Sequence, residues 1–211
     1  MTLLAVMGVM VLVAIALLAA APAVQQEVQR EKELESIRRG EEIADAILKY
    51  VVHHQGRKLP ESIDDLLEGL PQGTKKTQIL RPSSATDPLS EDGKWRLIQA
   101  EPKVIAAFAK RIMDYNNGLL PPNQSRFLDR YSVTITSSIN TENETDSEEP
   151  EEDENFDLIT DDVPFIGVAS QSRSKSVIAY YGIENHSKWI FTPLFRGSDG
   201  NPVPPPPPPP R

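Results

Sequence analysis

The chain of 211 residues is long enough for one domain with appendages but too short for two large domains. Cysteine is absent, which excludes disulfides, a thiol nucleophile and cysteine-based zinc sites. Residues 142–162 hold twelve acidic residues and no Lys or Arg, and without them the formal net charge of −9 becomes +3. Since no basic stripe stands out, we expect no nucleic-acid partner.

The N-terminal residues 3–24 form an uncharged apolar run. As a helix that rises 1.5 Å per residue, this run would span about 33 Å, which is the thickness of a bilayer core. A cleavable signal peptide is the alternative, but its apolar region is usually shorter and follows basic residues. We therefore predict a transmembrane anchor over residues 1–24, with the lipid bilayer as its partner.

Residues 25–55 continue the helical pattern, because apolar residues recur there at spacings of three and four. This spacing predicts an amphipathic helix that ends near Gly56. Its apolar stripe comprises Val28, Leu34, Ile37, Ala44, Ile47, Leu48 and Val51. The solvated faces are expected to carry Glu31, Lys32, Glu33, Glu35, Arg38, Arg39, Glu41, Glu42 and Asp45.

Residues 56–195 are predicted to form a small α+β domain, with the long helix packed on an antiparallel sheet. A short helix starts at Pro60 or Ser62, residues 71–92 are rich in turns, and residues 104–115 have helical spacing. Polar turns are expected at residues 171–174 and 182–187. The predicted strands cover residues 95–100, 131–139, 163–169, 176–181 and 188–192.

Two segments lack the apolar residues that a core requires. The acidic residues 141–157 are predicted to form a disordered loop, since they cannot bury enough surface to become ordered. A specific calcium site in this loop is disfavoured, because no D-x-[DN]-x-[DN]-G spacing occurs. Residues 196–211 form a proline-rich tail, in which a polyproline II ligand and a simple spacer are both open interpretations.

Several pieces of the sequence resemble the type IV pilin and type II secretion pseudopilin family. The start Met1-Thr2-Leu3-Leu4-Ala5 and Pro22 fall in register with a mature pilin. Further similar pieces are QREKELESIRRGEEIADAILKY, GRKLPESIDDLLEG, Asp87-Pro88-Leu89 with Gly93-Lys94-Trp95, Ile166-Gly167-Val168-Ala169-Ser170, and Lys188-Trp189-Ile190-Phe191.

The resemblance implies a pilin-like fold and a structural subunit of a secretion or pilus fibre. It implies a single pass through the bacterial inner membrane and a periplasmic domain. The expected partners are other copies of the chain, other pseudopilins and the assembly platform. The residues expected to matter are Thr2, Ala5 and Pro22, although Ala5 replaces the family's glutamate and cannot pair with a neighbour's terminal amine.

Two features point elsewhere. Arg30, Lys32, Arg38 and Arg39 follow the apolar run and, on the positive-inside rule, favour a cytoplasmic domain. Ala5 also suits the alternative function, a monomeric membrane-tethered periplasmic binding module.

Catalytic and metal-binding patterns are weak throughout the chain. Nucleophile-elbow, P-loop and H-E-x-x-H motifs are absent, so we expect no enzyme and no cofactor. His53 and His54 are expected in solvent at the end of the long helix, and His186 stands alone. Asp87, Asp161 and Asp162 are the least unfavourable metal candidates, while Trp95 and Trp189 are expected in the core.

Overall fold

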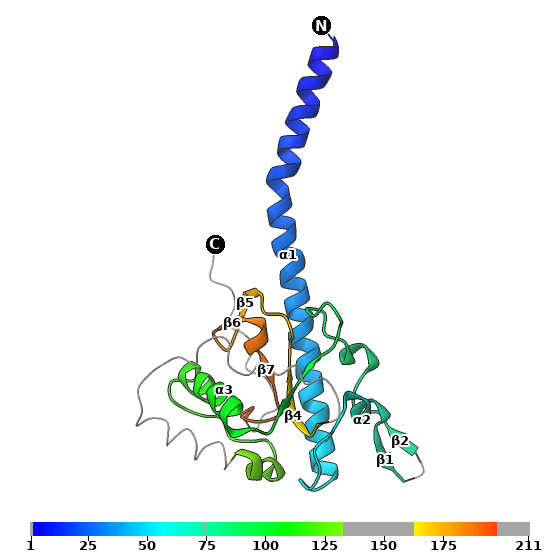
Figure 1. Cartoon of the computed structure of the whole chain (residues 1–211), viewed down its shortest axis with the longest axis vertical. Coiled ribbons are helices and arrows are strands. Elements are labelled where there is room, and N and C mark those ends of the chain that lie inside the picture. The colour runs from blue at the N-terminus through cyan, green and yellow to red at the C-terminus, as the bar shows by residue number, and fades with distance from the viewer. Residues whose placement is uncertain (1, 74, 133–162, 198–211) are drawn as a thin grey trace.

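One long helix and a compact α+β domain make up the structure, a computed structural model that describes residues 2–73, 75–132 and 163–197. Helix α1 (Thr2–His53) passes along the domain, and its N-terminal part projects far beyond it (Figure 1). The helix ends as predicted, because Gly56 adopts a left-handed φ of 74° and donates its N–H to the Val51 carbonyl at 2.8 Å.

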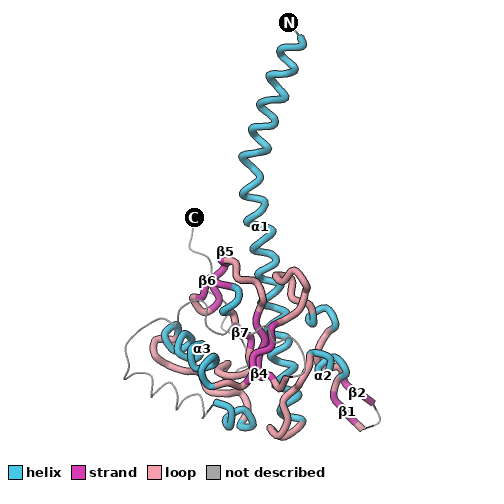
Figure 2. The backbone as a smooth tube through the Cα atoms, in the orientation of Figure 1, coloured by secondary structure: helices cyan, strands magenta, loops and turns pink. Residues whose placement is uncertain are grey.

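A three-stranded antiparallel sheet lies against α1 (Figure 2). Its central strand β4 (Phe165–Ala169) pairs with β3 (Arg96–Gln99) on one side and with β7 (Ile190–Phe191) on the other. All five residues of β4 are buried. A strand that is covered on both faces is expected to be continuously apolar, which is what FIGVA provides.

Two hairpins and several short helices complete the domain. Helix α2 begins after Ser62, which closes a capping box with Asp65, so the prediction of a start at Pro60 or Ser62 is confirmed. The remaining elements are α2 (Ile63–Glu68), β1 (Leu70–Gln72), β2 (Lys75–Thr77), η1 (Pro82–Ala85), α3 (Pro102–Tyr115), β5 (Lys175–Tyr180), β6 (Ile183–Asn185) and η2 (His186–Lys188).

The core lies between α1, the sheet and α3, and both tryptophans are buried in it as predicted. Trp95 meets Phe191 edge-on, with ring centroids 5.8 Å apart. Each indole N–H reaches a backbone carbonyl: Trp95 donates to Ser84 at 3.0 Å and Trp189 donates to Ile183 at 2.9 Å. The aromatic surface is therefore buried without leaving its polar atoms unpaired.

The α+β prediction is confirmed, and four of the predicted strands correspond to β3, β4, β5 and β7. The strand predicted over residues 131–139 is wrong where it can be compared, since residues 126–132 are helical. Residues 71–92 and 182–187 were expected to lack strands but contribute to β1–β2 and β6. Residues 133–162, with the acidic loop, and 198–211, with the proline run, lie outside the described residues.

Within the part of the chain that the structure describes, no helix has an apolar stretch long enough to cross a membrane.

Candidate functional site

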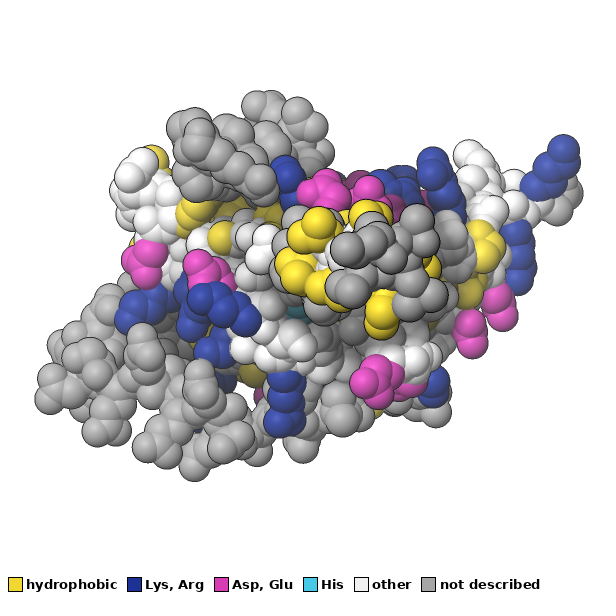
Figure 3. All heavy atoms as spheres, turned by 90° about the horizontal axis from the view of Figure 1, so that it is seen from above, with side chains coloured by type: hydrophobic (Ala, Val, Ile, Leu, Met, Phe, Trp, Pro, Cys, Tyr) yellow, Lys and Arg dark blue, Asp and Glu magenta, His cyan; other side chains and the backbone are white. Residues whose placement is uncertain are grey.

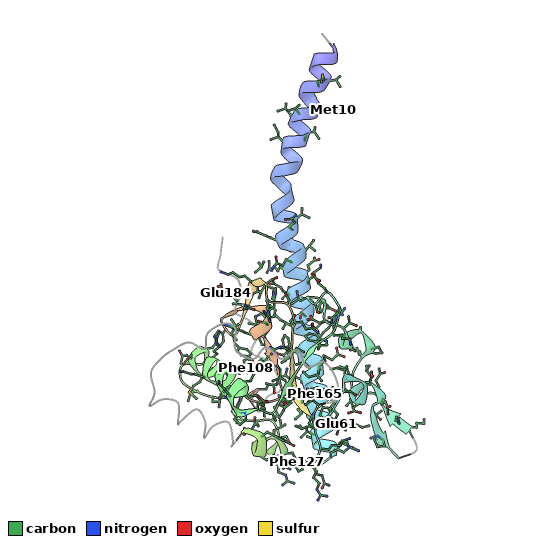
Figure 4. The ribbon with its side chains drawn as sticks, in the orientation of Figure 1. Met10, Glu61, Phe108, Phe127, Phe165 and Glu184 are labelled. Atoms are coloured by element: carbon green, nitrogen blue, oxygen red, sulfur yellow. The ribbon has the colours of Figure 1, made fainter. Side chains whose placement is uncertain are left out.

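The projecting part of α1 is the first candidate site. Every described side chain in residues 6–15 is exposed, and Figure 4 shows Met10 on this bare stretch of helix. A methyl group added to Gly8 would meet no described atom within 4 Å apart from the adjoining residues and backbone of its own helix. The large apolar side chains here are between 54% and 69% exposed: Val6, Met7, Val9, Met10, Val11, Leu12, Val13 and Ile15. A continuous apolar surface of this kind marks a contact with lipid or protein.

The three predicted assembly residues all lie in α1, but the structure does not bring them together. Thr2 and Ala5 occupy the first turns, and Pro22 lies about 26 Å further along at 1.5 Å per residue. Pro22 falls within the uninterrupted helix. The side chains of these three residues lie outside the described set.

Among the described hydrogen bonds between α1 and the domain, the one nearest the N-terminus is made by Gln29, whose side-chain amide donates to the Lys175 carbonyl at 3.2 Å. From here the buried face of the helix follows Glu33, Ser36, Ile37, Gly40, Ala44, Ile47 and Val51. The predicted stripe is correct in its C-terminal half and wrong at Val28 and Leu34, which are 47% and 45% exposed. Toward the N-terminus the buried face passes through the polar residues Glu33 and Ser36 instead of Leu34 and Val28.

Glu33 is the centre of this polar end and is completely buried. Its carboxylate accepts the backbone N–H groups of Val177 at 2.9 and 3.0 Å and of Ile178 at 2.8 Å, and the Gln29 amide at 3.0 Å. The prediction of a solvated Glu33 is wrong. The pairing of β5 with β6 is irregular between Lys175 and Tyr180, and Glu33 is the acceptor for the N–H groups of Val177 and Ile178 there.

His186 lies on the other side of the same carboxylate. Its Nε2 is 2.9 Å from Glu33 Oε1, its Nδ1 is 3.3 Å from the Ser172 hydroxyl, and the ring is 2% exposed. Sequence reasoning missed this pair because residues 33 and 186 are far apart in the chain. The available signal was the spacing of Glu33, which continues the buried period Ile37–Ala44–Ile47 toward the N-terminus.

Asp87 forms a second buried polar contact with α1 and is 1% exposed. Its carboxylate accepts hydrogen bonds from Ser170 Oγ at 2.7 Å, from Ser36 Oγ at 3.2 Å and from the Leu89 N–H at 3.0 Å. Burial raises the pKa of Asp87, and these three hydrogen bonds oppose the rise.

The described residues contain no group of three His, Cys, Asp or Glu side chains placed to hold a metal ion. Asp87, one of the predicted candidates, directs its oxygens to Ser170, Ser36 and the Leu89 N–H. Asp161 and Asp162 fall outside the described part of the chain.

A third polar contact joins α1 to the segment that follows β7. Arg196 forms ion pairs with Glu41 and, at 2.5 Å, with Asp45. The Tyr180 hydroxyl donates to Glu41, and burial raises the pKa of this phenol well above its usual value, so the proton stays on tyrosine. The end of the described chain is thus attached to the C-terminal third of the long helix.

These contacts orient α1 against the domain. Ser172, His186 and Glu33 are connected in series, and Glu33 also accepts backbone N–H groups of β5. Two surface hollows, of about 410 and 590 Å³, have linings without Ser172, His186 or Glu33, although Glu41 and Asp45 line the larger one. The polar groups therefore fix the angle between helix and domain.

Comparison with protein-family models, with curated proteins and with solved structures found no match for this chain. The resemblance to pilins and pseudopilins stays a prediction from the sequence.

Proposed function

We propose that this chain is a membrane-tethered structural subunit of a pseudopilin-like fibre of the type II secretion or type IV pilus kind. Its anchor is the apolar N-terminal part of α1, which sits in the bacterial inner membrane and packs against other copies or related subunits. The α+β domain lies on the periplasmic side. The chain carries out no catalysis in this proposal.

The observation that carries the proposal is the exposure of apolar residues 6–15 on a helix that the domain leaves uncovered. The uncharged sequence continues to Val24, which is exposed, and Gln29 then donates a hydrogen bond to the domain. Water is an unfavourable solvent for such a surface, because each fully exposed large apolar side chain forgoes about 1.5–3 kcal/mol of burial. Lipid and neighbouring helices both provide that burial.

The rigid attachment of α1 supports a mechanical role. Gln29, Glu33 and Ser36 hold the helix near the point where it leaves the domain, and Arg196 holds it further down. A subunit that transmits force through a fibre needs such a fixed angle, since a flexible linker would absorb the displacement.

A cysteine scan tests assembly directly, because the natural chain contains no cysteine. Single cysteines at each position from 6 to 15 are expressed in the full chain, and native membranes are treated with an oxidant. Cross-linked dimers should rise and fall with a helical period of about 3.6 residues, since one face of α1 meets the neighbouring copy. Cysteine at Leu119, an exposed position of the domain, controls for random collisions.

The same samples distinguish the competing functions. A chain that resists alkaline extraction but cross-links uniformly and weakly is a monomeric tethered module. A chain that leaves the membrane in alkali has no anchor, and the proposal fails.

A further inference from the structure

We propose that the face of the domain around the β5–β6 hairpin binds the headgroups of anionic phospholipids in the bilayer that holds α1. The inference rests on the proposed membrane anchor and adds a partner for the domain itself. Figure 1 shows this hairpin on the side of the domain from which α1 projects, and Figure 4 marks it with Glu184.

The hairpin lies at the depth of lipid headgroups. The Gln29 amide donates to the carbonyl of Lys175, the first residue of β5, at 3.2 Å. Gln29 follows Val24, the end of the apolar run, by about 7.5 Å along the helix axis at 1.5 Å per residue. A headgroup layer extends roughly 5–8 Å beyond the hydrocarbon core on each side. With the apolar run in the core, Lys175 therefore lies at the outer part of that layer.

The hairpin is also held in this position. The Glu33 carboxylate accepts the N–H groups of Val177 and Ile178, so the start of β5 cannot move away from α1 without breaking these buried hydrogen bonds. The headgroup-facing surface is thus preorganised, which lowers the entropic cost of binding.

The charge of this surface suits an anion. Arg111, Lys175 and Lys188 line a hollow of about 410 Å³ together with one carboxylate, that of Glu184. Glu184 pairs with Lys175 at 2.8 Å, which leaves the hollow with a net positive charge. In the view along α1 from its N-terminal end, Lys and Arg side chains lie around the apolar helix (Figure 3).

The same interpretation accounts for basic residues beside the apolar run. Arg30 and Lys32 follow it in the same helix, close to the level of Lys175, where they alternate with the carboxylates of Glu27 and Glu31. Such cations near an anionic membrane surface each gain a favourable interaction that decays within a Debye length.

Hydrogen exchange of the full chain in lipid nanodiscs tests the proposal. Discs of pure phosphatidylcholine are compared with discs of an equimolar mixture with phosphatidylglycerol. Amides of residues 175–185 should exchange more slowly in the anionic discs, by about fivefold for each cation that contacts a headgroup. Amides of β1–β2, which Figure 1 places at the opposite end of the domain, should not change.

A matched pair of triple variants shows which charges are responsible. Arg111→Gln, Lys175→Gln and Lys188→Gln together should abolish the difference between the two discs. Lys58→Gln, Lys75→Gln and Lys76→Gln remove the same charge from exposed positions elsewhere in the domain and should preserve it.

Three results would overturn the inference. One is equal amide exchange of residues 175–185 in the two kinds of disc. Another is loss of the difference between the discs in both triple variants. The third is equal slowing by inorganic phosphate added to phosphatidylcholine discs, which would identify a site for free anions. Failure of the chain to enter neutral discs is a different result, because it removes the membrane anchor and with it the proposed function.

Discussion

The two halves of α1 differ more than their shared helical backbone suggests. In residues 6–15 the large side chains are apolar and exposed, and no described part of the domain approaches them. Between Glu33 and Val51 the same helix buries one face. This face is polar toward the N-terminal end and apolar toward the C-terminal end. The first half can accept any apolar surroundings, whereas the second accepts one partner in one orientation.

The packed half owes its specificity to a few close contacts. Gly40 allows the helix to approach β7, since a methyl group there would lie 2.2 Å from the Phe191 ring. Glu33 and Asp87 add hydrogen bonds that exist in only one register of helix and sheet. Apolar contacts favour burial in general, while these groups select the angle at which α1 leaves the domain.

The largest effect is expected from Glu33→Ala. The substitution leaves two backbone N–H groups of β5 and the His186 ring without their acceptor, and should lower the free energy of unfolding by about 3 kcal/mol. The loss of stability is measured by chemical unfolding in a non-ionic detergent, with the fluorescence of the buried tryptophans as the signal.

Glu31→Ala is the matched control, because Glu31 is exposed on the same turn and should change stability by less than about 0.5 kcal/mol. Similar losses in both variants would mean that Glu33 contributes no more than a surface carboxylate.

A smaller effect is expected from Gly40→Ala, which introduces the clash with Phe191. Overpacking of this kind should cost about 2 kcal/mol after the gain in helix propensity is included. Gly8→Ala makes the same substitution in the projecting half and should leave the unfolding midpoint of the domain unchanged. If Gly40→Ala were as stable as the natural chain, the close approach of α1 to β7 would not be needed for the fold.

Sequence patterns predicted the elements whose local and tertiary preferences agree. The end of α1 at Gly56, the Ser62 cap of α2 and the apolar strand β4 were all expected. A turn was expected over residues 182–187, but it is confined to Tyr181 and Gly182, whose φ values of 48° and 73° are those of the common two-residue turn, and β6 follows at once. Tyr181 occupies a turn position that usually holds asparagine or glycine, so the sequence does not match the common pattern for this turn.

The candidate site was predicted only in part. Exposure of apolar residues 6–15 follows from a run too long and too uniform for one buried face. The burial of Glu33 is indicated only by its spacing from Ile37, and its charge outweighs that signal, since a carboxylate in a charged segment normally faces solvent. Its burial depends on β5 and His186, whose approach is a property of the tertiary fold.

The smallest effect is expected in the pH dependence of the free energy of unfolding, to which Asp87 contributes at acid pH. Burial raises the pKa of Asp87 above 3.8 despite its hydrogen bonds and the nearby His186, so the folded state binds this proton more tightly than the unfolded state. The free energy of unfolding should therefore gain a contribution as pH falls through the raised pKa, and the gain should level off below about 3.8. Asp87→Asn keeps the shape of the side chain and should remove this contribution.

The free energy of unfolding is measured from pH 7 to acid for Asp87→Asn and for the natural chain. The contributions of the other carboxylates cancel in the difference between the two curves. Glu35→Gln supplies a control of opposite sign, because hydrogen bonds from Arg38 and then Arg39 lower the pKa of Glu35 from 4.5 to about 2. The stability that Glu35 contributes is present above 4.5 and is lost as pH falls toward 2. Its size is small, since Glu35 is 35% exposed. Difference curves that slope in the same direction for both variants would show that Asp87 is stabilised as an anion, and that α1 is held there by charge rather than despite it.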